Sequence, residues 1–115
     1  MKSAKRSPCP VACTLDIIGD KWTLLVIRDM LLGRSHFKDF VASPEGIATN
    51  ILTDRLNKLI ESGLAQKYAS TESFGRDAYR LTKKGESLLP ILKAVAKWGP
   101  EQRMQPKKIS PVAAM

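Results

Sequence analysis

Hydrophobic residues recur at helical spacing in the first part of the chain, between strong helix-ending signals. A first helix is predicted from Pro10, a residue type favoured at the first helical position, up to Gly19. Asp20 is a good N-cap for a second helix that ends at Gly33. Ser35 is expected to cap a short third helix that contains residues 37–41.

The next helix has the most complete amphipathic pattern, and it is predicted over about residues 48–62 with Gly63 ending it. On a wheel of 100° per residue, its apolar side consists of Ile51, Leu52, Leu56, Leu59 and Ile60. Its polar side centres on Asn50, Asp54, Asn57 and Glu61, with Thr53 and Lys58 flanking. A turn with Pro and Gly at 43–46 joins it to the third helix, so the two predict a helix-turn-helix.

The chain then changes period. Leu64–Tyr68 and Ala78–Leu81 are strand-like and flank a polar loop, which predicts a β-hairpin. A last helix, capped by Thr82 and bent at Pro90, should carry a wide apolar stripe up to Gly99. The predicted fold is therefore mainly α (α+β): a winged helix-turn-helix with a two-stranded hairpin wing and flanking N- and C-terminal helices.

The length of 115 residues favours one domain, at 9–99, between basic tails at 1–8 and 100–115, the second of which we expect to be disordered. The net charge is +8, and each tail holds three basic residues against at most one acidic residue. Basic tails suit a polyanionic partner such as DNA. No apolar run approaches the roughly 18 residues of a membrane span, and no secretory signal follows the basic start, so we expect a cytoplasmic protein without membrane contact.

A set of short motifs resembles the HxlR family of winged-helix regulators. The motifs span residues 9–99 in family order, and the set is specific although each motif alone is weak. They are Cys9-Pro-Val, Ile18–Leu25, Gly46-Ile47, Leu52–Leu59, Ser62–Leu64, Tyr79–Thr82, Gly85, Leu88–Pro90 and Trp98-Gly99. The resemblance implies a bacterial DNA-binding transcription regulator that dimerises through its first and last helices.

Two features depart from the family pattern. Ala48 stands where the family often has a Ser that caps the recognition helix, so Thr49 is expected to cap it instead. Asp54 and Glu61 place negative charge on a surface expected to meet DNA.

The helix at 48–62 is the expected recognition helix, which enters the major groove with its N-terminal residues on base edges. We assign Thr49, Asn50, Thr53 and Asp54 to base edges, since Asn pairs with adenine and Asp accepts from cytosine. Lys58 is a phosphate contact, and Arg55 either reaches phosphate or braces the domain through an ion pair. The expected wing and backbone contacts are Arg76, Ser73, Lys67, Lys38 and Arg34. Alternatively, this polar face is only solvated, as on most surface helices.

Cys9 and Cys13 lie four residues apart at the start of the first helix. A helix N-terminus with Lys5 and Arg6 nearby is a setting that stabilises a thiolate, and some HxlR members sense oxidants or electrophiles at this Cys-Pro motif. Cys9 is thus the candidate redox sensor and Cys13 a weaker one. The alternative is that Cys9 is a small apolar residue packed at a dimer interface.

The excess apolar surface of the first and last helices predicts a homodimer on an inverted-repeat operator. Its interface residues would be Val11, Leu15, Ile18, Leu88, Leu92, Val95 and Trp98. No tetrahedral metal-ligand set or catalytic motif is evident, so we expect no metal, no cofactor and no enzymatic activity. An oxidant or small-molecule effector stays open. The competing functions are a protein-interaction module, supported by Asp54 and Glu61, and a redox-active thiol protein that depends on Cys9.

Overall fold

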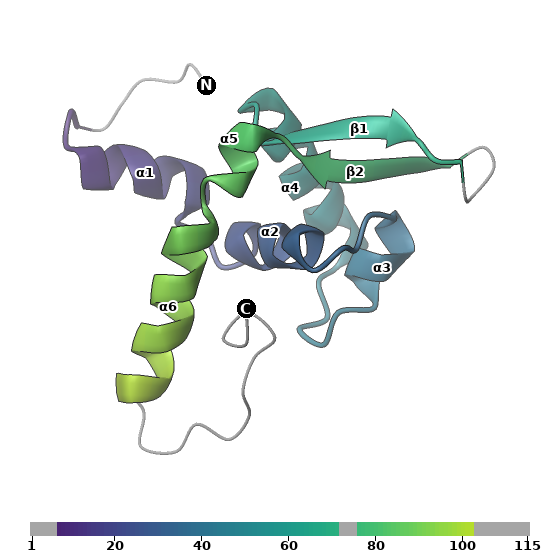
Figure 1. The fold of residues 1–115 in the computed structure, drawn as a ribbon. Coiled ribbons are helices and arrows are strands. Elements are labelled where there is room, and N and C mark those ends of the chain that lie inside the picture. Colours follow the sequence, from purple (N-terminus) through teal and green to yellow (C-terminus); the bar gives the residue numbers. More distant parts are fainter. Residues whose placement is uncertain (1–6, 72–75, 103–115) are drawn as a thin grey trace.

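A computed structural model describes residues 7–71 and 76–102 as six helices and one two-stranded antiparallel sheet (Figure 1). The elements are α1 (Pro10–Ile18), α2 (Thr23–Leu31), α3 (Phe37–Val41), α4 (Thr49–Glu61), β1 (Ala65–Ala69), β2 (Asp77–Leu81), α5 (Lys83–Glu86) and α6 (Leu89–Gln102). This order confirms the predicted winged helix-turn-helix, with α3 and α4 as the motif and β1–β2 as the wing. None of the helices within the described ranges is long and apolar enough to cross a bilayer.

Helices α1 and α2 begin close to the predicted positions. Pro10 is the first residue of α1, and Gly19 follows its last residue, as predicted. Regular α2 geometry begins only at Thr23, three residues after Asp20. The Asp20 carboxylate nevertheless accepts hydrogen bonds from the backbone N–H groups of Trp22 (2.9 Å) and Thr23 (3.1 Å). Asp20 therefore accepts the hydrogen bonds expected of an N-cap residue, although a turn at residues 21–22 separates it from the first residue of α2.

The start of α3 differs from the prediction. Its N-cap is His36 rather than Ser35, and the Asp39 carboxylate accepts from the His36 backbone N–H at 3.1 Å. The Ser35 hydroxyl lies 3.2 Å from the ring Nδ1 of His36. The Ser35 carbonyl accepts from the Tyr79 N–H at 2.8 Å, and His36 forms a β-bridge with Ala78. The segment before α3 is thus attached to the free edge of β2, which closes the helical part of the domain onto the wing.

The wing is a regular antiparallel hairpin in which Ala65 pairs with Leu81 and Ala69 with Asp77. Both strands lie within one residue of the predicted runs. The hydrophobic core lies beneath this sheet, where α2, α3 and α4 meet. Its largest fully buried side chains are Ile27, Phe40, Leu52, Leu56 and Leu59.

The predicted last helix is interrupted. It is divided into α5 and α6 at Ser87-Leu88, because Pro90 has no N–H to donate to a carbonyl four residues earlier. Pro90 instead occupies the first turn of α6, where its missing N–H costs nothing. Gly99 does not end α6, which continues through Pro100 to Gln102. The expectation that Gly99 ends this helix is therefore wrong, and residues 103–115 of the predicted tail lie outside the described ranges.

The apolar residues predicted for a dimer interface divide into two groups. Val11, Leu15, Val95 and Trp98 are exposed, by 52% to 65%, whereas Ile18 (7%) and Leu92 (6%) are buried within the domain itself, and Leu88 is half-buried. Ile18 and Leu92 therefore offer little surface to a partner chain, because their side chains are already buried within this one. Helices α1 and α6 lie on the side of the domain away from the wing tip and α3 (Figure 1).

Candidate nucleic-acid interface

The polar face of α4 is open to solvent along the helix. Its apolar residues pack inward, with Leu52, Leu56 and Leu59 buried. The exposed residues are Thr49, Asn50, Thr53, Asp54, Asn57, Lys58 and Glu61. This division matches the predicted wheel, and the outward face meets no other part of the described chain that would bury it.

The N-terminus of α4 has no side-chain cap. Its N-cap residue is Ala48, and Thr49 is the first residue inside the helix, so the expectation that Thr49 would cap is wrong. The first N–H groups of α4 are consequently free of side-chain acceptors at the cap position. The Thr53 hydroxyl donates to the Thr49 carbonyl at 3.0 Å, which holds the Thr53 side chain against the helix.

Arg55 braces the domain, which was one of its two predicted roles. Its Nε donates to Asp20 at 2.8 Å and its Nη1 to Asp54 at 2.5 Å, which links α4 to the segment before α2. Burial alone would raise the pKa of Asp20, but hydrogen bonds from Thr23 and Arg55 outweigh it and lower that pKa well below its usual range. The hydrogen bond with Asp20 likewise raises the pKa of Arg55.

The negative charge of Asp54 is partly compensated by its neighbours. Besides Arg55, the Lys58 ammonium lies 3.6 Å from the Asp54 carboxylate, one helical turn further on. The departure from family pattern at Asp54 is therefore balanced by two cations on the same face. Glu61, the other acidic departure, is exposed at the far end of the helix from the residues assigned to bases.

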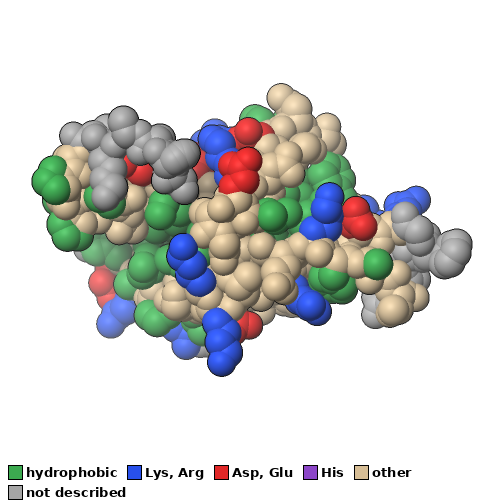
Figure 2. Space-filling view, turned by 90° about the horizontal axis from the view of Figure 1, so that it is seen from above, with side chains coloured by type: hydrophobic (Ala, Val, Ile, Leu, Met, Phe, Trp, Pro, Cys, Tyr) green, Lys and Arg blue, Asp and Glu red, His purple; other side chains and the backbone are tan. Residues whose placement is uncertain are grey.

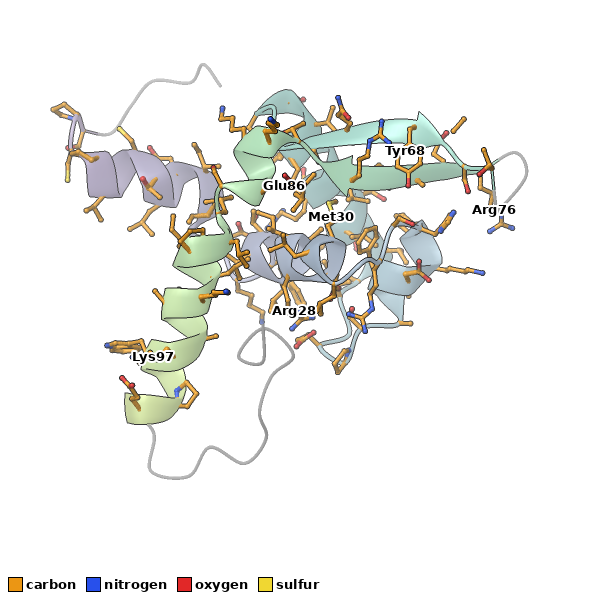
Figure 3. All side chains as sticks on the ribbon, in the orientation of Figure 1. Arg28, Met30, Tyr68, Arg76, Glu86 and Lys97 are labelled. Carbon is orange, nitrogen blue, oxygen red and sulfur yellow. The ribbon has the colours of Figure 1, made fainter. Side chains whose placement is uncertain are left out.

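Two of the predicted backbone contacts meet at the junction of α3 and the wing. Lys38 and Arg76 both line a surface hollow of about 280 Å³. The other lining residues, which sequence reasoning did not assign, are His36, Phe37, Asp77 and Tyr79. Figure 3 shows Arg76 where β2 meets the wing loop, at the end of the hairpin remote from α5. Lys38 and Arg76 outnumber the single carboxylate, Asp77, in this lining, so the hollow has a net positive charge that suits a phosphate group.

Other predicted contacts already have partners within the chain. Lys67 lies 3.7 Å from the Asp77 carboxylate, and Arg34 donates to Asp29 at 3.0 Å. The Arg34 side chain remains 39% exposed. Ser73 lies outside the described residues.

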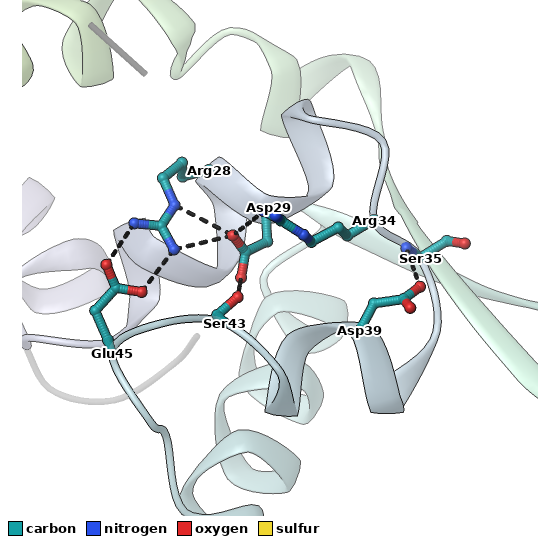
Figure 4. A network of polar contacts seen from close by, with 7 residues as sticks. All are labelled: Arg28, Asp29, Arg34, Ser35, Asp39, Ser43 and Glu45. Carbon is teal, nitrogen blue, oxygen red and sulfur yellow. Dashed lines mark hydrogen bonds and ion pairs between the residues drawn. The ribbon is translucent and has the colours of Figure 1, made fainter. Parts of the chain in front are cut away.

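Sequence reasoning missed a buried charge network behind the helix-turn-helix (Figure 4). Arg28 donates to both carboxylate oxygens of Glu45 at 2.8 Å and to Asp29 at 2.9 Å. The Asp29 carboxylate also accepts from the Ser43 hydroxyl. The available signal was a pair of charged residues, Arg28-Asp29, inside an apolar helix, since such charges are buried only when paired. The hydrogen bond with Arg28 lowers the pKa of Glu45, and the same bond raises the pKa of Arg28.

Cys9 is exposed, directly before α1, and Cys13 is half-buried one turn later. The Ser7 hydroxyl accepts from the Cys9 backbone N–H at 3.0 Å, and the Cys13 thiol lies 3.4 Å from the Ser7 carbonyl. The Cys9 side chain is thus accessible to solutes, as a sensor would require. Hydrophobic side chains are visible at the end of the molecule formed by α1 (Figure 2).

Known proteins provide an independent comparison. The HxlR-like helix-turn-helix family matches this chain over residues 17–107. An uncharacterised HTH-type transcriptional regulator of Mycobacterium bovis is 32% identical over 84% of this chain, which spans 61% of that relative's length. The regulator YvaP of Bacillus subtilis is 31% identical over 76% of this chain and 81% of its own length.

Solved structures give the same result. PA1607, described as a candidate transcription factor, has a TM-score of 0.81 at 41% identity, over 90% of this chain and 72% of its own. The redox regulator HypR in its reduced form has a TM-score of 0.75 at 30% identity, over 84% and 95%. The chain belongs to the HxlR-like helix-turn-helix family, and the relatives that carry a functional description are transcriptional regulators.

Proposed function

We propose that this chain acts in the cytoplasm as a homodimeric, sequence-specific DNA-binding transcription regulator on an inverted-repeat operator. The single observation that carries the proposal is the unobstructed polar face of α4, which faces outward because Leu52, Leu56 and Leu59 on the opposite face are buried. A major groove admits one such helix, and the adjacent wing can reach the flanking backbone or minor groove. Family membership supports the same function.

The proposed base contacts are Thr49, Asn50, Thr53 and Asp54, at the N-terminal half of α4. Lys58, Lys38 and Arg76 would contact phosphates, the last two at their shared hollow. Three further cations are proposed to contact phosphates: Arg34, Arg55 and Lys67. Each already forms an ion pair with a carboxylate, and on DNA it would either share itself between the two anions or release the carboxylate. Ser73 in the wing loop is proposed as a further contact.

A contrast between two variants tests these roles. Asn50→Ala should relax sequence preference at one base pair, at a cost of about 1–3 kcal/mol of discrimination. Arg76→Ala should weaken binding to all duplexes alike and reduce the slope of log affinity against log salt by about one. Titrations of preferred and scrambled duplexes at several salt concentrations measure both. Unchanged sequence preference in Asn50→Ala would refute the recognition assignment. If duplex binding by the unaltered chain did not depend on salt concentration, a protein-interaction module would be favoured instead.

The homodimer is proposed from the exposed apolar residues of α1 and α6. Large hydrophobic side chains are exposed on α1 (Val11 and Leu15) and on α6 (Val95 and Trp98). Leu88, just before α6, is half-buried. A two-fold symmetric dimer would bury these side chains between its two copies. It would place the two α4 helices about 34–36 Å apart, or a multiple of this distance.

Sedimentation equilibrium tests this assembly. The unaltered chain should be a dimer at micromolar concentration, and Trp98→Ala should weaken it by about 2 kcal/mol or more if Trp98 is a central anchor, roughly thirtyfold. Lys83→Ala, at an exposed position on α5, is the control and should leave the dimer intact. A monomeric unaltered chain would contradict the proposal.

We further propose that oxidation of Cys9 lowers the affinity of the protein for its operator. It is supported by the exposure of Cys9 and by the likeness to HypR, which is described as a redox regulator. Peroxide or quinone should lower the operator affinity of the unaltered chain, and Cys9→Ser should abolish that change. Cys13→Ser serves as the matched control and should retain most of the response. If Cys9→Ser still loses affinity on oxidation, Cys9 is only a packing residue.

A further inference from the structure

The charge network joins the turn that leads into α4 to α2, in addition to the turn's own backbone hydrogen bonds from Ser43 N–H to Phe40 and from Gly46 N–H to Ser43. Ser43 and Glu45 are the two turn residues with side-chain hydrogen bonds to this network, and both bond to α2 residues. Gly46 follows in the left-handed region, with φ of 69°, and the buried Ile47 comes next. The network, together with the buried side chain of Ile47, therefore helps to fix where the backbone enters α4.

This anchoring matters because α4 lacks the usual device for fixing its first turn. Ala48 offers no side-chain acceptor, so no local cap holds the helix start. The residues proposed to read bases occupy that same first turn and the next one. A shift of the turn would move them directly, since a base contact depends on hydrogen-bond distances and angles.

The α2 side of the network is built for rigidity. The side chains of Arg28 and Asp29 are only 7% and 4% exposed, so neither can reach a nucleic acid. Arg28 contacts Glu45 through two parallel hydrogen bonds, a geometry that fixes orientation as well as distance. Asp29 adds contacts to Ser43 in the turn and to Arg34, a proposed phosphate contact. One buried carboxylate thus connects the turn before α4 to a side chain at the protein surface (Figure 4).

We infer that Arg28 and Asp29 are positioning residues for DNA reading, which act by holding Ser43 and Glu45 and so setting the register of the uncapped α4 on its duplex. This inference rests on the proposed function. It predicts that weakening the network reduces discrimination between sequences more than it reduces binding to duplex DNA in general. Non-specific binding depends on exposed cations, and these remain in place when the network is weakened.

The test compares Glu45→Ala and Ser43→Ala with the unaltered chain. For each, the affinity for a preferred duplex is divided by the affinity for a scrambled duplex of equal length, at one salt concentration and with active protein titrated. This ratio should fall by about tenfold in Glu45→Ala, similar to the loss of one base contact, and less in Ser43→Ala. Affinity for the scrambled duplex should change by less than about twofold.

Leu64→Ala is the control, because it creates a core cavity at the opposite end of α4 and should lower stability without changing the ratio. A ratio that falls equally in Leu64→Ala would mean that the network is only structural, and an unchanged ratio in Glu45→Ala and Ser43→Ala would overturn the inference. If the unaltered chain itself shows no sequence preference, it is the proposed function that fails.

Discussion

Asp29→Ala is expected to lower the free energy of unfolding by about 3–5 kcal/mol, because it removes one of the two carboxylates that pair with the buried Arg28 guanidinium, together with the acceptor of the buried Ser43 hydroxyl. Asp29 accepts hydrogen bonds from Arg28, Arg34 and Ser43, and its side chain is 4% exposed. After its removal, Arg28 would retain only the two bonds to Glu45, and the buried Ser43 hydroxyl would lose its acceptor. Denaturant unfolding at fixed protein concentration measures this loss.

Asp54→Ala is the matched control for Asp29→Ala. Asp54 also contacts two cations, but its side chain is 50% exposed. Water can replace those contacts, so the expected loss is about 1 kcal/mol or less. The double variant Arg28→Met with Asp29→Ala should cost less than the sum of the two single changes, since it leaves less buried charge unpaired. Equal losses in Asp29→Ala and Asp54→Ala would contradict the buried-network interpretation.

Leu52→Ala is expected to cost about 2–5 kcal/mol, the range for a leucine truncated inside a packed core. Leu52 is 0% exposed and lies in the core cluster beneath the sheet, on the inner side of α4 from the residues proposed to read bases. The truncation should therefore destabilise the domain and loosen the attachment of α4. Thermal or denaturant unfolding provides the measurement. Asn57→Ala, on the exposed face of the same helix, is the control and should change the free energy of unfolding by about 0.5 kcal/mol or less. If Leu52→Ala had an equally small effect, Leu52 would not be a core residue.

The elements that sequence predicted well are those encoded locally. The α4 pattern separates inward from outward residues over more than three turns, and Gly63 ends the helix in the left-handed conformation (φ 78°) that its residue type favours. Likewise, Asp20 supplies capping bonds to the residues directly after it. In each case the residues that determine the structure are neighbours in sequence.

Two of the errors concern contacts between distant segments. Ser35 is a good N-cap by residue type, but its carbonyl is bonded to the Tyr79 N–H on β2, and helix capping passes to His36. Periodicity also cannot distinguish an apolar residue that the domain buries from one that it leaves exposed. Leu92 and Val95 lie on one predicted stripe, yet only Leu92 packs into the core cluster.

The exposed residues of the candidate site could be predicted from the sequence, but the network that holds them in place could not. The outward face of α4 follows from a helical wheel, and the wing cations from their positions in the hairpin. The network of Arg28, Asp29, Ser43 and Glu45 joins α2 to a turn fourteen or more residues later, and no local pattern specifies that pairing. A pair of charges within an apolar helix indicates only that partners exist, and tertiary structure is needed to identify them.

Selection of bound sequences from a random duplex pool tests the central claim most directly. The account predicts that the unaltered chain enriches an inverted repeat whose half-sites lie about 10–10.5 base pairs apart, or a multiple of this spacing. Such a result requires two copies of α4 to read base edges across a two-fold axis. Recovery of sequences no different from the starting pool, at a salt concentration where the protein still binds DNA, would contradict it.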